Sequence, residues 1–297
     1  MPSLKILITL FTLYLSWGSC YSAIKIAIQT IPPLFMVGSQ FIIAGFILLL
    51  WCIYKKENTI SWSNWKNYLL LGLLMIVMGT GGLVLAEQSV PSGLSAVLIS
   101  TEAFWMVLFD WIIKKSRPKR RVIAGLCIGL IGIIYLVDPL NLTSSQPINI
   151  TGSILLLVTA LAWAAGSVAS RHLVLPDSFL STISIQMLCG GILLILMSAL
   201  IGELNMLHWN TISFSSWMAW GYLTLFGTLI GYIAYTWLLK FTTISVASSY
   251  AYITPIVALS LGGLIADEKL TGPMILACFV ILTGVSLMVN YGMEKKY

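Results

Sequence analysis

An acidic side chain, Glu102, lies in the middle of a long apolar stretch, residues 92–112. A carboxyl group at the centre of a bilayer costs about 2.5 to 3.5 kcal/mol on insertion scales, so by default it faces a protein interior or a water-filled cavity. Two interpretations remain open. Either Glu102 binds a substrate ammonium group or a coupling proton, or it is a protonated carboxyl that bonds a neighbouring helix. We favour the first, which is the default for ionisable groups at this depth.

Aromatic and amide side chains at similar depth are candidates for the walls of the same site. Trp105 is three residues after the acidic residue and therefore on the same helical face, where it either offers a cation–π surface or packs. Trp17 and Trp163 either line a cavity or pack in the core. Gln40 and Gln186 each donate and accept hydrogen bonds, and they either flank a common cavity or hold one helix to its neighbour.

A proline in the apolar stretch 245–266 predicts a second polar site. Pro255 has no backbone donor, so we expect a helix break that frees carbonyls for substrate or water. Tyr250 and Thr254 are four residues apart and share a face, as do Ser248 and Tyr252, so only one pair needs to face the cavity. The expected substrate-binding residues are therefore Glu102, Trp105, Trp17, Trp163, Gln40, Gln186, Tyr250, Tyr252 and Thr254.

The composition places these residues in a membrane protein with many spans. Of 297 residues, 59% are hydrophobic and only 9% charged, whereas soluble domains carry roughly a quarter charged residues. A spanning helix needs about 20 apolar residues. Runs of that length lie at 4–24, 34–54, 67–86, 92–112, 122–137, 151–170, 179–200, 216–239, 245–266 and 273–291. We expect an all-α integral membrane protein with these ten transmembrane helices.

The distribution of lysine and arginine predicts the orientation of the chain in the membrane. With the N-terminus in the cytoplasm, fourteen of the sixteen basic residues lie on the cytoplasmic side, the bias that sets topology. We therefore expect both termini in the cytoplasm and a bacterial inner-membrane location, with the lipid bilayer as a partner. Lys25 and Arg171 lie at the ends of spans, where we expect snorkelling anchors, with a gate as the alternative.

The sequence contains no motif that indicates enzymatic chemistry. The two histidines, His172 and His208, have no metal-ligand spacing, and the five cysteines occur singly, so we expect no metal. The sequence contains neither Walker A nor GxSxG nor GxGxxG, which argues against nucleotide binding and against an enzyme. We expect no cofactor. We also expect no nucleic-acid partner, because the basic residues lie between apolar runs rather than on the face of a soluble fold.

The two halves of the sequence repeat each other. At an offset of 146 residues the matches are Trp17 with Trp163, Lys25 with Arg171, Gln40 with Gln186 and Gly45 with Gly191; from the third span the offset is 152, and the matches include Gly79 with Gly231 and Glu102 with Thr254. Each half, 1–140 and 150–292, holds five predicted helices, an odd number, so the second half is inverted in the membrane. Inverted repeats are typical of transporters that bind their substrate near the bilayer midplane.

Several short motifs resemble one known family. They are Leu15-Ser16-Trp17-Gly18, Pro32-Pro33, the run from Gln40 to Gly45, the run from Ala86 to Gly93, Phe226-Gly227-Thr228, Pro255 and the run from Asp267 to Thr271. Together they resemble the EamA family of the drug/metabolite transporter superfamily. The resemblance implies ten helices in two inverted EamA repeats around a central cavity, with export of amino acids or other small metabolites as the typical activity. Gln40 stands where such proteins often have Arg, and Ala103 stands where proline is usual.

These patterns together predict a secondary transporter that works by alternating access around a midplane cavity, lined by the first, second, fourth, sixth, seventh and ninth helices. We expect export of an amino acid or a related amine, with a proton gradient as one energy source. Uptake or exchange of another metabolite or drug, and a polytopic accessory or lipid-handling protein, are the alternatives. We expect a monomer or a homodimer, with the GxxxG motif at Gly125 and Gly129 packing inside the monomer or between two copies.

Overall fold

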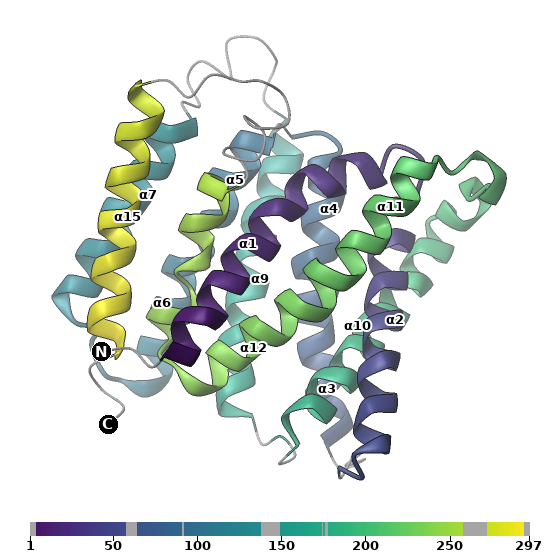
Figure 1. Ribbon diagram of the computed structural model, residues 1–297, viewed down its shortest axis with the longest axis horizontal. Helices are drawn as coiled ribbons and strands as arrows, with labels where there is room; N and C mark the ends of the chain where they lie inside the picture. Colours follow the sequence, from purple (N-terminus) through teal and green to yellow (C-terminus); the bar gives the residue numbers. More distant parts are fainter. Residues whose placement is uncertain are drawn as a thin grey trace.

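The computed structural model of the protein describes residues 4–57, 64–90, 92–137, 149–173, 175, 178–257 and 272–293, which are mostly helical and contain no strand. The motif from Asp267 to Thr271 and the end of the ninth expected span lie outside these residues. Figure 1 shows these helices packed into one bundle. The helices follow the predicted apolar runs closely, because an apolar segment in lipid must satisfy all its backbone groups internally.

The first half runs through α1 (Leu4–Ala27), α2 (Pro33–Tyr54), α3 (Trp65–Leu71), η2 (Gly72–Gly81), α4 (Gly82–Glu87), α5 (Ser92–Ser100), α6 (Glu102–Lys114) and α7 (Arg120–Val137). The second half contains α9 (Ile150–His172), α10 (Phe179–Leu200), the short η3 (Glu203–Met206) and η4 (Trp209–Thr211), α11 (Phe214–Tyr222), η5 (Leu223–Gly231), α12 (Tyr232–Phe241), α13 (Ile244–Ala247), a helical run at 250–257, and α15 (Gly272–Met293).

Six of the described helices are long and apolar enough to cross a membrane, namely Leu4–Ala27, Pro33–Tyr54, Trp65–Glu87, Ile150–His172, Phe179–Leu200 and Phe214–Phe241. Shorter apolar helices occur at Ile244–Val257 and Ile275–Val289. Large apolar side chains such as Phe11, Ile131 and Phe279 are exposed on the outside of the bundle. A surface covered in this way suits lipid rather than water, so the chain is a membrane protein with several spans.

Glycines let helices of the two halves approach closely. The α2/α10 pair lies at one edge of the bundle and the α7/α15 pair at the opposite edge (Figure 1). A Cβ on Gly191 would lie 2.9 Å from the Gly38 carbonyl oxygen, and one on Gly125 would lie 2.7 Å from that of Gly284. Only glycine permits such contact. The GxxxG face that begins at Gly125 is therefore covered by α15 of the same chain.

Two π-helical segments, η2 and η5, occupy equivalent positions in the two halves. Such segments are rare and often mark functional sites. A Cβ on Gly79 in η2 would meet Trp163 of α9 at 2.7 Å, and a Cβ on its repeat mate Gly231 would meet Trp17 of α1 at 2.4 Å. The first helix of each half thus packs against the third helix of the other half, an exchange that fits two related repeats.

The ninth expected span is interrupted before Pro255 rather than at it. The interruption lies at Ser248 and Ser249, where the Ser249 hydroxyl donates to the Val246 carbonyl (2.7 Å) and the backbone bonds tighten to a three-residue spacing. Serine hydroxyls compete for helix carbonyls in this way. Pro255 lies inside the helical run 250–257, where its missing N–H removes one backbone bond without ending the helix.

Candidate functional site

A cavity of about 140 Å³ lies between the two halves of the bundle. It begins at mid-helix and extends toward the end at which α1 terminates, as its lining residues Ile24, Met36 and Leu83 show. The third and eighth helical stretches contribute through η2, α4, η5 and α12, which the sequence did not predict. No described residue of α10, the seventh expected helix, lines it.

Glu102 is the acidic residue of this cavity. It begins α6, is 4% exposed, and has one carboxyl oxygen, Oε1, buried without a hydrogen-bond partner among the described residues. The Tyr250 hydroxyl lies beside this carboxyl and also lacks a well-formed bond within the described part of the chain. Buried polar groups are nearly always bonded. Because Glu102 lines the cavity, its orphaned carboxyl oxygen is a candidate partner for a ligand or a proton.

Gln40 presents the complementary group. Its side chain is buried in α2, its Oε1 accepts a long bond from the Thr228 hydroxyl (3.4 Å), and its Nε2 has no partner among the residues that the structure describes. Both residues line the cavity. Because α2 and α6 lie on different sides of the bundle (Figure 1), the cavity offers an unused donor from one side and an unused acceptor from the other.

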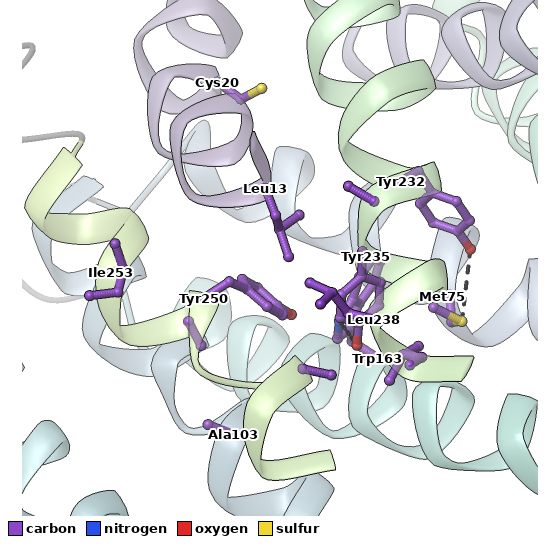
Figure 2. Packing of buried hydrophobic residues seen from close by; sticks show 14 of the residues in the cluster. Leu13, Cys20, Met75, Ala103, Trp163, Tyr232, Tyr235, Leu238, Tyr250 and Ile253 are labelled. Carbon is purple, nitrogen blue, oxygen red and sulfur yellow. Dashed lines mark hydrogen bonds between the residues drawn. The ribbon is translucent and has the colours of Figure 1, made fainter. Parts of the chain in front are cut away.

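Five aromatic side chains, which we call the aromatic floor, meet at the mid-helix end of the cavity: Trp17, Trp163, Tyr232, Tyr235 and Tyr250. The Trp17 ring centroid lies 5.5 Å from Trp163, 5.0 Å from Tyr235 and 4.7 Å from Tyr250. The Trp163 Nε1 donates to the Tyr235 hydroxyl (3.1 Å), which also bonds Ser167 (2.5 Å). Figure 2 shows Tyr235, Tyr250 and Trp163 converging near Leu13 and Leu238. The floor is thus a bonded aromatic layer that closes one end of the cavity.

Gln186 lies beyond the floor rather than in the cavity. Its Nε2 donates to the Tyr232 hydroxyl (2.5 Å), which in turn points at the Met75 sulfur (3.8 Å; Figure 2). Gln186 lines a second cavity of about 420 Å³ together with Arg171 and Lys240. Arg171 donates to the Thr242 carbonyl (2.8 Å). The Gln186–Tyr232 bond therefore lies between the two cavities.

Three other expected residues point elsewhere. Trp105 stacks on Phe109 (6.3 Å between centroids) and does not line the cavity. Three residues along a helix amount to about 300°, which leaves Trp105 rotated away from the Glu102 direction. The Tyr252 hydroxyl donates to the Leu126 carbonyl (3.2 Å) on α7. Lys25 is exposed and lies near Glu87.

The expected residues that do line the cavity are Trp17, Gln40, Glu102, Trp163, Tyr250 and Thr254. Tyr21, Tyr232 and Tyr235 join the site without having been anticipated. A signal for Tyr232 existed, since it directly follows Gly231, the repeat mate of Gly79. Glu87 is buried, and neither of its carboxyl oxygens is hydrogen-bonded within the described part. No group of His, Cys, Asp and Glu among the described residues could hold a metal ion.

Comparisons with known proteins agree with this architecture. The sequence profile described as the EamA-like transporter family matches residues 4–137 and 150–290. The inner membrane transporter YedA of Escherichia coli (strain K12) is 36% identical over 281 residues, covering 94% of this chain and 89% of YedA. A probable amino-acid metabolite efflux pump of the same strain is 24% identical over 283 residues, covering 92% and 91%.

A solved crystal structure superimposes with a TM-score of 0.77 at 18% sequence identity, covering 97% of this chain and 98% of the other. At that identity the likeness shows the fold. The profile matches cover most of the sequence, and the identity to YedA extends over nearly the whole chain. The chain therefore belongs to the EamA-like transporter family.

Proposed function

We propose that this chain is a secondary active transporter that exports a small amine-bearing metabolite, of the amino-acid kind or related to it, across the cytoplasmic membrane by alternating access. The observation that carries the proposal is the orphaned Glu102 carboxyl in a cavity between the two halves. A carboxyl inside a membrane protein is retained where it binds a cation or a proton. The similarity to a probable amino-acid metabolite efflux pump supports the export direction.

The two cavities fit the two access routes that such a cycle needs. With the N-terminus in the cytoplasm, as the basic residues predict, the end at which α1 terminates faces outward, and the central cavity opens toward that side. The second cavity, with Arg171 and Lys240, then lies on the cytoplasmic side. The aromatic floor and the Gln186–Tyr232 bond separate the two cavities, so this conformation is the outward-facing one. Rocking of one half against the other must open the floor.

The cycle runs on a gradient or by exchange, because the sequence carries no nucleotide-binding motif. We propose the proton as the coupling ion and Glu102 as the group that carries it, since substrate and proton can then compete for one carboxyl. Substrate bound from the cytoplasm displaces the proton, and a proton from outside displaces the substrate. This order gives export coupled to proton entry without a second ionisable site.

Flux through proteoliposomes tests the proposal. Vesicles with the wild-type protein are loaded with radiolabelled amino acids or small amines, and efflux is followed after an inward proton gradient is imposed. The Glu102→Gln variant should reduce gradient-driven efflux by about tenfold or more, as expected for the loss of a bond to a charged group. Glu57→Gln, which removes a carboxylate outside the cavity, is the matched control and should transport normally. Equal efflux from wild type and Glu102→Gln would reject the role of Glu102.

A further inference from the structure

The central cavity is lined by a Glu102 carboxyl oxygen and by two donors, Gln40 Nε2 and the Tyr250 hydroxyl, that have no hydrogen-bond partner in the described chain, and the described residues that line it include no Lys, Arg or His. We infer that it selects an organic monocation: a protonated amine on an apolar or aromatic body with a neutral hydrogen-bond acceptor, and without a free carboxylate. The inference rests on the proposed function and names the substrate class of that site. It follows from charge balance, from the donors already in use, and from the shape of the walls.

Charge balance separates an amine from a zwitterion. An ion is stable away from water only when it is paired. A protonated amine beside the Glu102 carboxylate forms a neutral pair, whereas an amino acid brings a second carboxylate that needs its own cation. Two cations on helices that line the cavity are not among its lining residues: Lys25 of α1 is exposed and near Glu87, and Arg171 of α9 lines the second cavity beyond the floor.

Three threonine hydroxyls of the cavity are already in use as donors, whereas Gln40 Nε2 and the Tyr250 hydroxyl, which lies beside Glu102, have no partner in the described chain. The Thr80 hydroxyl donates to the Met75 carbonyl (3.4 Å), that of Thr159 to the Met78 carbonyl (3.1 Å), and that of Thr228 to the Gln40 Oε1 (3.4 Å). Gln40 Nε2 is buried and unused within the described part of the chain. One neutral N–H group satisfies a carbonyl, amide or ether oxygen. It does not compensate a buried carboxylate, whose desolvation costs far more.

The walls suit an aromatic or compact apolar body. Trp17, Trp163 and Tyr250 lie together at the floor, and aromatic rings within about 6 Å of a cation stabilise it. The cavity volume of about 140 Å³ is close to the roughly 150 Å³ that holds a benzene ring in an engineered cavity. A single phenyl ring therefore fits this space.

Four ligands that differ in one group at a time test the inference: phenylalaninamide, phenethylamine, phenylalanine and 3-phenylpropionate. Binding to the full-length, detergent-purified protein is measured by titration calorimetry, with melting temperature as the check on folding. We expect phenylalaninamide to bind most tightly, and phenylalanine to bind about tenfold or more weakly than phenylalaninamide. 3-Phenylpropionate, which has only the carboxylate, should not bind.

Variants assign each part of the ligand to its residue. Glu102→Gln should weaken both amines by about tenfold. Gln40→Leu should bring phenylalaninamide to the affinity of phenethylamine and leave phenethylamine unchanged, because only the amide carries an acceptor for Nε2. Lys25→Gln should leave all four affinities unchanged. Glu57→Gln, outside the cavity, is the control for changes that affect stability alone.

The outcomes separate the inference from the proposed function. If phenylalanine binds as tightly as phenylalaninamide and both depend on Glu102, the substrate class is wrong while the amine site stands. A loss of phenylalanine affinity in Lys25→Gln would identify the missing cation and overturn the inference in the same way. If none of the amines binds, or if Glu102→Gln binds them all as well as wild type, both the inference and the proposed role of Glu102 are wrong.

Discussion

Trp17 and Trp163 are repeat mates, and they make the same backbone contact with different hydrogen bonds. Each indole lies against a glycine of a π-helical segment in the opposite half, Trp17 on Gly231 and Trp163 on Gly79. The Trp17 Nε1 donates across the halves to the Gly227 carbonyl (3.0 Å), whereas the Trp163 Nε1 donates within its own half to Tyr235 (3.1 Å). The two repeats are therefore related by a two-fold symmetry in how these helices pack, but the hydrogen bonds of the two tryptophans do not follow that symmetry.

The broken symmetry explains why the cavity opens at one end. By the repeat offsets, Leu83 is the equivalent of Tyr235, and Tyr21 is the equivalent of Ser167. At the closed end, Tyr235 and Ser167 bond each other at 2.5 Å. At the other end, Leu83 has no polar atom for such a bond, and it and Tyr21 line the open cavity. In the proposed alternating-access cycle, this hydroxyl pair, present in the second half and absent from the equivalent position, favours the state in which the floor is closed.

Substituting alanine for Gly79 or Gly231 should change the stability of the protein more than any other substitution that tests this comparison. A Cβ on Gly231 would lie 2.4 Å from Trp17 Nε1, and one on Gly79 would lie 2.7 Å from Trp163 Cε3. Overpacking of this kind typically costs about 1 to 3 kcal/mol. We expect a lower melting temperature in detergent for both variants, and a larger decrease for Gly231→Ala, because it also displaces the Trp17 bond to Gly227.

Gly221→Ala is the control for those variants. Gly221 lies in the same helical stretch as Gly231, in α11, and a Cβ there would meet nothing within 4 Å. Alanine is favoured over glycine in a helix by about 1 kcal/mol, so the melting temperature should stay the same or rise. If Gly231→Ala behaves like Gly221→Ala, the close approach of Trp17 to η5 is not as the structure places it.

Removing the Tyr235 hydroxyl should have the next largest effect. Tyr235→Phe leaves the Trp163 Nε1 and the Ser167 hydroxyl without their shared partner, which weakens the floor. Loss of about 1.4 kcal/mol from the closed floor shifts the balance between the two states about tenfold. A cysteine at Thr182, in the second cavity, should react faster with a maleimide in the Tyr235→Phe background, with the five native cysteines replaced by serine.

The equivalent position supplies the control for the floor. Leu83→Phe places phenylalanine at the position equivalent to Tyr235, as Tyr235→Phe does in the other half, but it removes no hydrogen bond. The cysteine substituted for Thr182 should therefore react with the maleimide at the wild-type rate. A labelling rate that is unchanged by Tyr235→Phe would mean that the hydroxyl pair does not hold the floor closed.

Much of the fold follows from the sequence, because length and hydropathy decide which segments can cross lipid. The long helices lie within a few residues of the predicted runs, and the repeat matches alone relate Trp17 to Trp163, which the structure brings together in the floor. The π-helical segments could not be predicted, since a shift to five-residue bonding has no compositional signature. The interruption of the ninth span could not be located from Pro255, because it lies at Ser248 and Ser249, whose hydroxyls compete locally for helix carbonyls.

Only those features of the site that depend on hydropathy and helical spacing could be predicted from the sequence. Glu102 stood out because an ionisable group in an apolar run has an obvious energetic cost. Trp105 and Tyr252 were misplaced relative to the cavity because the rotation of a helix about its axis is set by packing with its neighbours, which a single sequence does not contain. Tyr235 could not be assigned, because its role depends on a contact with Ser167 on another helix.

The smallest effects should come from the glutamine pair, and they should separate stability from binding. Gln186→Leu removes the bond to Tyr232 (2.5 Å) and should lower stability by about 0.5 to 1.5 kcal/mol, while amine affinity measured by calorimetry stays unchanged because α10 does not line the cavity. Gln40→Leu should do the reverse: it removes a buried N–H that has no partner in the described chain, together with one long bond from the Thr228 hydroxyl (3.4 Å), so stability changes little while affinity for phenylalaninamide falls. Equal effects of the two variants on both readouts would mean that the repeat mates share one role and that the side chains leave the symmetry intact at this pair.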